Sequence, residues 1–530
     1  PGGVPGGHKY VTHFLDDWLT AQMQWTRRIY DRVNPHTGLH YAEDPAIALV
    51  EITNENSLVA GWLGGSLERL PESHRRALDE RWNAWLSDRY GSDEALAAAW
   101  SGGDRAGLAL GESLSFGSVG RHPVQRWMTP LWPMGRVEDL WTFYSELEDA
   151  YLTQMRAFLQ EELGFDVPLT GTIAFGRGHA DMLQGTSDFV DVHFEWDQAT
   201  HRRDLRNISA LQDPAAFRIL ERIGWGQEGI PLTFSELNHP HPNRHGAEAP
   251  ILWATLGRKQ GIDAIVWFAY AHGGYERTPQ EIEGIFDLRA RTGLWIQMPT
   301  ASALFRSSSL EEADGRYVYW RSRGALVDEL ARFGTPAVAQ FRDVDFALRN
   351  RLRSSFADGP QGQKLGDAST DSGWWTSPGV LLVQTEQVEG IVGELGMEPQ
   401  DLEHGGGLRT LEHLQVRSSG HGAVHLQALD EQAVGESRDL LLVAVGRTGN
   451  AGETWSGGDR AILTWGTDPV AVERLVGEIW FRTKGRPVVH SLGERGLPLE
   501  RVSVRRRWNG WWSIDMQDGA PSPWFRIQVP

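Results

Sequence analysis

The sequence predicts an α/β fold over residues 1–300, followed by an all-β sandwich over residues 370–530. In the first part, strand-like apolar runs alternate with segments of helical periodicity, which is typical of βα units around a parallel sheet. In the last part, short strand-like runs follow one another and are separated by Gly-rich turns. The length of 530 residues is ample for several domain-sized units.

The composition argues against several classes of protein. The net charge of −19, from 51 Lys and Arg against 70 Asp and Glu, disfavours nucleic-acid binding, which needs a positive field. Apolar runs such as Leu440–Val445 are too short to cross a bilayer, so no membrane partner is expected. The absence of cysteine excludes disulfides and thiolate metal sites. The 24 Trp suit a carbohydrate-handling protein, although core packing explains most Trp residues in most proteins.

The first part opens with a helical pattern over Tyr10–Val33. The apolar run Ala46–Ile52, interrupted by Glu51, then predicts a strand that is buried on both faces. A long helical insertion over 57–165 follows, with helical spacing in Arg81–Trp100 and Glu138–Leu163. The remaining strands of this part are predicted over Val167–Phe175, Phe189–Phe194, Ile230–Phe234 and Ile262–Tyr270.

Residues 301–369 are predicted to form a connector with one helix, over Gly324–Phe333. The sandwich then begins at Thr370. Its strands are predicted over Gly379–Gln384, Gly422–Leu426, Asp439–Val445, Ala461–Trp465, Val476–Phe481, Val502–Arg506 and Pro523–Gln528.

Two glutamates stand where predicted strands end. Glu55 follows the run Ala46–Ile52, and Glu236 follows Ile230–Phe234. In (β/α) barrels the active site is built at the C-terminal ends of the strands. Cleavage of a glycosidic bond needs two carboxyl groups, one to protonate the leaving oxygen and one to attack the anomeric carbon or activate water. With 70 acidic residues in the chain, a chance placement of the two at strand ends stays open.

Both glutamates lie in segments with a recognisable pattern. AIALVEITNENSL (Ala46–Leu58), with its Asn-Glu step, resembles the fourth-strand motif of the retaining (β/α)8 glycoside hydrolases of clan GH-A, and PLTFSELNHPHPN (Pro231–Asn243) resembles their seventh strand. The likeness is to the cellulase and β-galactosidase type, glycoside hydrolase family 5 or a related family. Further similar segments follow in the same order: Arg81–Trp100, Glu138–Ala174, Asp191–His193, Glu248 and Gly261–Tyr270, with Thr370–Gly373 and Glu436–Trp455 similar to the accessory sandwich of large bacterial members.

The resemblance implies a retaining β-glycosidase or endo-β-glycanase with a TIM-type (β/α)8 barrel and a carbohydrate substrate. Glu55 would be the acid/base and Glu236 the nucleophile. The double-displacement mechanism needs no cofactor, and none is expected. The sugar, exo or endo attack and the oligomeric state stay open.

Four further residues are candidate substrate contacts. Asn54 would hydrogen-bond the sugar 2-hydroxyl, with a turn-forming Asn as the alternative. His193 would line the sugar pocket, unless it is a satisfied core histidine. Trp267 and Tyr270 would form a stacking floor under the sugar. Because they are three residues apart on one strand, alternation allows at most one of them to point into the site.

The sequence departs from the pattern of the clan at two places. Where relatives carry a Tyr two residues after the His of the sixth strand, this chain has Glu195. A carboxylate close to Glu236 is expected to raise the pKa of one of the two and to weaken the nucleophile, unless Glu195 turns away or pairs with a nearby Arg. Only one helix precedes the fourth-strand motif, so the barrel is expected to be N-terminally incomplete and to consist of strands 4 to 8.

A cluster of three histidines, His239, His241 and His245, invites a metal-binding interpretation. The prolines between them better suit a rigid loop, and no acidic residue stands at a fixed ligand spacing, so no metal site is predicted. The chain also lacks the phosphate-binding, zincin and α/β-hydrolase motifs.

Two alternatives to an active glycosidase stay open. One is an inactive carbohydrate-binding homologue, which Glu195 and the missing strands favour. The other is a truncated product without function. The chain starts at Pro1 with no signal-like segment, so secretion or periplasmic location is expected only if a signal lies upstream, and a cytoplasmic location otherwise.

Overall fold

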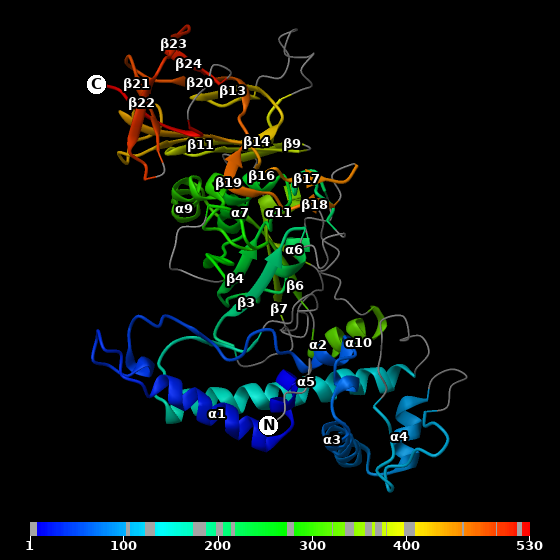
Figure 1. Cartoon of the computed structure of the whole chain (residues 1–530). Helices are drawn as coiled ribbons and strands as arrows, with labels where there is room; N and C mark the ends of the chain where they lie inside the picture. Colours follow the sequence, from blue (N-terminus) through cyan, green and yellow to red (C-terminus); the bar gives the residue numbers. More distant parts are fainter. Residues whose placement is uncertain are drawn as a thin grey trace.

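The computed structural model describes residues 8–101, 107–121, 133–172, 187–197, 205–213, 218–272, 280–320, 322–333, 344–355, 363–365, 374–377, 379–396, 409–457, 461–493, 495–516 and 522–530. Figure 1 shows three tiers along the molecule: N-terminal helices at one end, strands and helices in the middle, and antiparallel sheets at the other end.

The N-terminal tier is built on the long helix α5 (Met134–Ala157). Its other helices are α1 (Asp16–Tyr30), α2 (Leu58–Leu63), α3 (Glu72–Tyr90) and α4 (Asp93–Trp100). Four buried tryptophans pack where these helices meet: Trp62 against Trp141, with ring centroids 5.5 Å apart, and Trp82 against Trp100, at 6.2 Å. These four tryptophans therefore serve packing rather than sugar binding.

The middle tier contains short parallel sheets. β1 (Val50–Glu51) pairs with β2 (Leu169–Thr170), and β3 (Val190–Glu195), β4 (Leu232–Asn238) and β5 (Ala264–Trp267) form a second sheet in chain order. The amide of Asp188, just before β3, donates to the carbonyl of Leu169 at 2.8 Å, so β2 and β3 are neighbours. The helices that connect the strands are α6 (Arg218–Ile223), between β3 and β4, and α7 (Ala249–Lys259), between β4 and β5.

These sheets confirm the predicted α/β arrangement but not the barrel. Within the described residues the parallel sheets have two or three strands, and no closed barrel is formed. β5 is an edge strand, and its Val266 is 56% exposed. The strand predicted over Ala46–Ile52 shrinks to Val50–Glu51, because β2 is its one partner strand in the described chain and Leu49 is 45% exposed.

Residues 301–369, expected to be a connector, hold regular elements. The expected helix is α10 (Arg323–Phe333). β6 (Gly315–Trp320) pairs in parallel with β7 (Asn350–Ser355) and antiparallel with β8 (Gln363–Leu365). Two more helices, α9 (Met298–Arg306) and α11 (Val344–Arg349), complete this part.

The third tier is the predicted β-sandwich. An eight-stranded antiparallel sheet has the order β22-β21-β25-β15-β14-β11-β10-β9, and a five-stranded sheet has the order β12-β13-β20-β24-β23. The strands of the larger sheet are β9 (Trp374–Ser377), β10 (Val380–Gln384), β11 (Val388–Glu394), β14 (His421–Ala428), β15 (Asp439–Val445), β21 (Val488–Leu492), β22 (Pro498–Val502) and β25 (Trp524–Gln528). Those of the smaller sheet are β12 (Arg409–Thr410), β13 (Leu414–Ser419), β20 (Val476–Arg482), β23 (Arg505–Arg506) and β24 (Trp511–Asp515).

The central strands β11, β14 and β15 of the larger sheet are buried on both faces. On β15, Leu440 and Leu442 face the smaller sheet, whereas Leu441 and Val443 belong to the core of the middle tier. This double burial explains why β15 is continuously apolar instead of alternating. Among the described residues, no helix combines the length and apolarity needed to cross a membrane.

Several polar contacts fix the sandwich to the middle tier. Imidazole Nε2 of His421, on β14, lies 2.8 Å from Oε2 of the buried Glu248. An excursion from the sandwich also contacts the middle tier. It is made of β16 (Thr448–Ala451), β17 (Thr454–Trp455), β18 (Ile462–Thr464) and β19 (Thr467–Val472). There, Trp465 donates from Nε1 to the carbonyl of Ile282 at 2.6 Å.

Candidate active site

Three of the predicted site residues meet at the C-terminal ends of the parallel strands. His193 Nδ1 lies 3.0 Å from Oε1 of Glu55 and 3.4 Å from Oε2 of Glu236. One side-chain atom from each of the three residues lies within 4.8 Å of those of the other two. The His193 side chain is 1% exposed, that of Glu236 18% and that of Glu55 28%, so both carboxylates are reached from solvent while the imidazole between them is not.

Strand pairing places His193 and Glu236 side by side. They are register partners on β3 and β4, at an irregularity that follows Val192. Parallel strands end at the same edge of a sheet, so both side chains emerge at one edge. The prediction that the two strands present functional groups at their C-terminal ends agrees with this placement.

Glu55 sits in the turn between β1 and α2, with a φ of +48°. A non-glycine residue in this region is strained, and such residues persist where the surroundings fix them. The next residue provides that fixation, because the Asn56 amide donates to Thr172 Oγ1 at 2.9 Å and its side chain donates to the Lys9 carbonyl at 2.7 Å. Ser57 then caps α2 by accepting from the Ala60 amide at 3.2 Å.

A second set of polar groups orients the imidazole. His193 Nε2 lies 3.1 Å from Ser235 Oγ. The backbone amide of Ser235 donates to the buried Asp191 at 3.0 Å, and Thr233 Oγ1 donates to the same oxygen at 2.5 Å. The ring plane of His193 is therefore fixed from behind by the Ser235 and Asp191 pair.

The electrostatics of the site follow from this crowding. Burial favours the neutral form of His193, but its hydrogen bond to Glu55 and the charges of Glu236 and Asp191 outweigh burial and raise its pKa above the ordinary value. Burial also raises the pKa of Glu236, and the negative charges of Glu55 and Asp191 add to the effect. The site thus favours a shared proton between imidazole and carboxylates.

The departure at Glu195 has the expected electrostatic consequence. Burial and the charges of Glu236 and Glu55 raise the pKa of Glu195 to about 7, while His193 and Arg222 act in the opposite direction. Of the two carboxyls, Glu195 is thus the one whose pKa shift includes the interaction between Glu195 and Glu236.

Glu51, Asp191 and Ser235 are site residues that the sequence analysis did not select. Burial, with the charge of Asp191 next, raises the pKa of Glu51 to about 8, and Glu51 Oε1 is buried without a hydrogen-bond partner in the described chain. The signal for Glu51 was a single charged residue within an apolar strand run. For Asp191 the signal was its position two residues before His193, on the same face of the strand.

The predicted substrate contacts Asn54, Trp267 and Tyr270 are not brought to the carboxylates. Asn54 is exposed in its turn. Trp267 pairs with Leu237, the neighbour of Glu236, and so points to the opposite face of the sheet. Together with Tyr270 it lines an apolar cavity of about 350 Å³ between β5, α7 and α9.

Another aromatic group lies on the carboxylate side of β5. The Phe268 ring packs against His272 and Phe286, with centroid distances of 5.2 and 5.4 Å. His272 is near enough to Glu236 for its charge to lower the pKa of that carboxyl. Phe268, one residue beyond the predicted Trp267, is therefore the better candidate for a wall of the site.

The histidines of HPHPNRH do not converge on one point. His239 is fully buried, and His241 Nε2 lies 2.9 Å from Glu453 Oε1 in the sandwich excursion. In the part of the chain that the structure describes, Glu55, His193 and Glu236 are the one group of His, Asp and Glu side chains whose potential ligand atoms meet. His239, His241 and His245 therefore do not present a common ligand set within the described residues.

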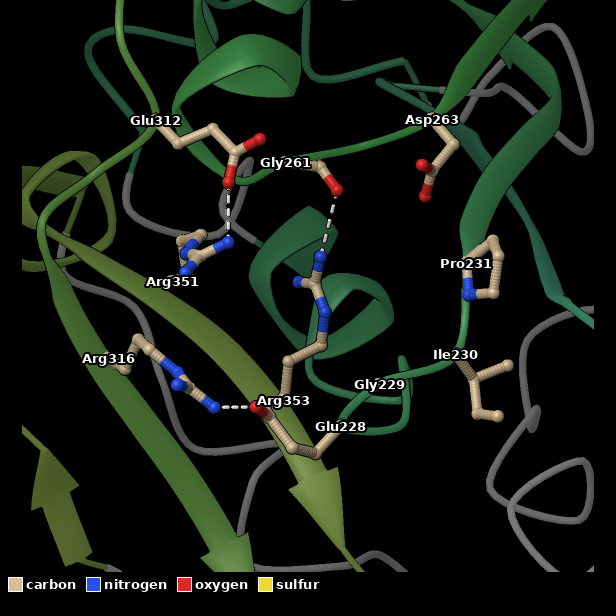
Figure 2. Close-up of a pocket in the computed structure, with 10 residues that line it drawn as sticks. All are labelled: Glu228, Gly229, Ile230, Pro231, Gly261, Asp263, Glu312, Arg316, Arg351 and Arg353. Carbon is tan, nitrogen blue, oxygen red and sulfur yellow. Dashed lines mark hydrogen bonds and ion pairs between the residues drawn. The ribbon is translucent and has the colours of Figure 1, made fainter.

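A second polar cavity, of about 370 Å³, lies at the opposite ends of β4 and β5 (Figure 2). Arg351 pairs with Glu312 and Arg316 pairs with Glu228. Arg353 donates to the Gly261 carbonyl at 2.9 Å. With Asp263, the cavity has three acidic residues against three arginines, and its contacts hold the loops before β4 and β5 to β6 and β7.

Comparisons with known proteins give structural likenesses of low identity. No protein-family model matches the chain, and no curated protein matches it. A β-galactosidase from the psychrophilic Marinomonas ef1 is 15% identical with a TM-score of 0.40, over 65% of this chain and 54% of that chain, so this chain spans about half of its length.

Two further solved structures are similar at the same level. A β-galactosidase from the Antarctic haloarchaeon Halorubrum lacusprofundi is 14% identical with a TM-score of 0.39, over 95% of this chain and 83% of that one. An exo-β-agarase is 14% identical with a TM-score of 0.36, over 56% and 40%. At these values the likenesses identify neither the family nor the substrate of this chain.

Proposed function

We propose that this protein is a retaining glycoside hydrolase that cleaves β-glycosidic bonds of an oligo- or polysaccharide. The observation that carries the proposal is the Glu55 and Glu236 pair, whose carboxylate oxygens lie within 4.8 Å of each other beside His193. Retaining enzymes hold their two carboxyl groups about 5 to 5.5 Å apart, whereas inverting enzymes need about 6.5 to 9.5 Å to admit a water molecule.

The proposed first step uses each glutamate once. Glu55 gives its proton to the glycosidic oxygen as the bond from the anomeric carbon to that oxygen breaks, and a Glu236 oxygen bonds to the anomeric carbon. Glu236, the less exposed of the two, has its charge stabilised by His193 Nδ1 at 3.4 Å. The more exposed Glu55 lies on the solvent side, where the leaving group departs.

The second step reverses the proton flow. When Glu236 is esterified its negative charge disappears, so the pKa of neighbouring carboxyls falls and Glu55 becomes a base. Glu55 then takes a proton from water, the water oxygen bonds to the anomeric carbon, and the Glu236 ester bond breaks. No cofactor takes part in either step.

The finer assignments in this proposal rest on the sequence resemblance. They are clan GH-A, a barrel related to strands 4 to 8 within residues 1–300, a connector over 301–369 and an accessory sandwich over 370–530. The order β1 to β5 of neighbouring strands supports the barrel-type assignment.

An inactive carbohydrate-binding homologue is the second candidate. The observation that favours it is the crowding of carboxylates at the site, because burial and the charges of Glu55 and Asp191 raise the pKa of Glu236 and weaken it as a nucleophile. Under this alternative, Glu236→Gln leaves sugar affinity nearly unchanged and no hydrolysis is seen.

A panel of aryl β-glycosides tests the proposal, with the anomer formed first observed by NMR. We expect hydrolysis of at least one member with retention of configuration, and its loss in Glu236→Gln. Glu389→Gln is the matched control, because Glu389 is a buried glutamate 2.8 Å from His413 in the sandwich. Inverted product, or full activity of Glu236→Gln, contradicts the proposal.

A further inference from the structure

We propose that Glu55, His193 and Glu236 bind a divalent transition-metal cation of the Zn²⁺ type, and that this cation inhibits the enzyme. Binding stands on the geometry of the cluster alone, whereas inhibition rests on the proposed glycosidase function. From the sequence we predicted no metal site, so this inference comes from the arrangement of the side chains.

The spacing of the potential ligand atoms fits a compact cation. Zn²⁺ takes His nitrogen at about 2.0–2.1 Å and carboxylate oxygen at about 2.0–2.2 Å in tetrahedral geometry, which places neighbouring ligand atoms roughly 3.3 to 3.6 Å apart. His193 Nδ1 lies 3.0 and 3.4 Å from the two carboxylate oxygens. The third pair of atoms, within 4.8 Å, involves the partly exposed Glu55, whose side chain has room to adjust.

The groups behind His193 hold its ring as the outer neighbours of a metal-binding histidine do. A ligating histidine usually has its other ring nitrogen hydrogen-bonded, which fixes the tautomer and the ring orientation. His193 Nε2 lies 3.1 Å from Ser235 Oγ, and the Ser235 amide is held by the buried Asp191. Nδ1 is therefore the nitrogen that faces the two carboxylates.

The charges around the cluster favour a cation. Glu51 Oε1 is buried without a hydrogen-bond partner in the described chain, and Glu51 interacts electrostatically with Glu55, His193 and Glu236. The imidazole of His193 can carry one positive charge, which is less than the negative charge of the carboxylates around it. A dication bound among them balances the remaining negative charge.

The ligand set also selects the kind of cation. One imidazole and two carboxylates suit Zn²⁺ and related transition metals, while Mg²⁺ prefers oxygen ligands and keeps several waters. Three protein ligands leave one position open to solvent. A cation held by both carboxylates prevents Glu55 from carrying its proton and Glu236 from attacking, so inhibition is competitive with the substrate.

Isothermal titration of the full chain with ZnCl₂ tests the binding. We expect one zinc per chain in the wild type, no comparable binding of MgCl₂, and zinc affinity at least about tenfold weaker in His193→Gln. Ser235→Ala removes the hydroxyl that lies 3.1 Å from His193 Nε2, with an expected loss of zinc affinity of about 10- to 100-fold. His413→Gln is the matched control, since His413 makes a similar contact of 2.8 Å to Glu389 in the sandwich.

Circular dichroism checks that each variant folds. If His193→Gln does not fold, Glu55→Gln replaces it, because Glu55 lies in a partly exposed turn. Zinc binding that is absent in the wild type, or unchanged in both His193→Gln and Glu55→Gln, overturns the inference. Zinc binding lost in these variants, in a protein that hydrolyses no glycoside, supports the binding site and contradicts the proposed function instead. Hydrolysis that zinc does not inhibit contradicts the inhibition alone.

Discussion

The two ends of strands β4 and β5 carry polar clusters of opposite character. At the N-terminal ends, three arginines face three acidic residues, and the charges balance (Figure 2). At the C-terminal ends, five carboxylates surround His193, and the charge is unbalanced. A balanced network satisfies its own members and holds segments together. An unbalanced one keeps carboxyl groups at raised pKa values, which is typical of sites that move protons.

The largest expected effect comes from removing either member of the carboxylate pair. In Glu236→Gln the nucleophile is lost, so kcat/KM falls by about 10³-fold or more. In Glu55→Gln the acid is lost, and the fall is about 10²- to 10⁴-fold. Steady-state kinetics on the best aryl glycoside measure both. A fall in kcat/KM of less than tenfold in both variants contradicts a catalytic role of the cluster at the C-terminal ends of the strands.

The second prediction concerns the orientation of His193. Asp191→Asn weakens the acceptor that holds Ser235, so the imidazole loses its fixed plane and kcat falls by about 10- to 100-fold while folding is retained. Kinetics show the fall, and a pH profile separates it from misfolding, because the acid limb shifts when the charge of Asp191 is removed from Glu236. A uniform loss of activity with an unshifted profile contradicts the positioning role.

The third prediction concerns the charge-balanced cluster at the N-terminal ends of β4 and β5. Arg353→Ala leaves the carbonyls of Leu352, Gln260 and Gly261 without a donor, which lowers the free energy of unfolding by about 1–3 kcal/mol. Activity at a temperature where the variant is folded stays at the wild-type level. Urea unfolding and kinetics on the same preparation measure the two effects. A large loss of activity without a loss of stability contradicts the structural role of the cluster at the N-terminal ends.

The fourth prediction is a shift in pH dependence. Activity requires ionised Glu236, whose raised pKa places the acid limb of kcat/KM at higher pH than for an ordinary carboxyl. Glu195 has a pKa of about 7, so it is neutral over most of this limb, and Glu195→Gln leaves the limb in place while it changes the activity near pH 8, where Glu195 is ionised in the wild type. Rate measurements between pH 4 and 8 are sufficient. An acid limb that moves to lower pH in Glu195→Gln contradicts the raised pKa of Glu195.

The last prediction concerns how stability depends on pH. Glu51 has a folded-state pKa of about 8 against an ordinary 4.5, so between these values the folded state binds more protons than the unfolded state. Stability therefore falls as pH rises through this window. Glu51→Gln removes that dependence, so the variant gains stability relative to the wild type at pH 8 more than at pH 5. Thermal unfolding at both values measures the difference, and an equal difference at both contradicts the raised pKa.

The sequence was most informative where one residue type stands at a strand end. Glu55 and Glu236 are predicted on that basis and His193 from the resemblance of its strand, and the structure brings the three together. Alternation allows at most one of Trp267 and Tyr270 in the site, and Trp267 lies on the face of the sheet opposite Glu236, where irregularities in β3 and β4 shift the register in a way that one strand alone does not reveal. Asp191 and Ser235 were missed because their role depends on a contact between neighbouring strands.

The fold shows the same division. The continuous apolar run of β15 reflects burial on both faces, so its strand was predicted correctly. The run Ala46–Ile52 is similarly apolar, but only two of its residues form β1. A strand needs neighbouring strands, and in the described chain β2 is the one strand that pairs with β1. Barrel closure is likewise a property of strand partners rather than of any one segment.

The central claim is that Glu236 forms a covalent bond to the sugar. The most direct measurement is mass spectrometry of the protein after reaction with a panel of activated 2-deoxy-2-fluoro-β-glycosides, which slow the second step of double displacement. We predict a single glycosyl adduct, mapped by proteolysis to the peptide of β4 and to Glu236. An adduct on Glu195 or Glu55, or turnover of ordinary substrates with no adduct from any member of the panel, contradicts the proposed mechanism.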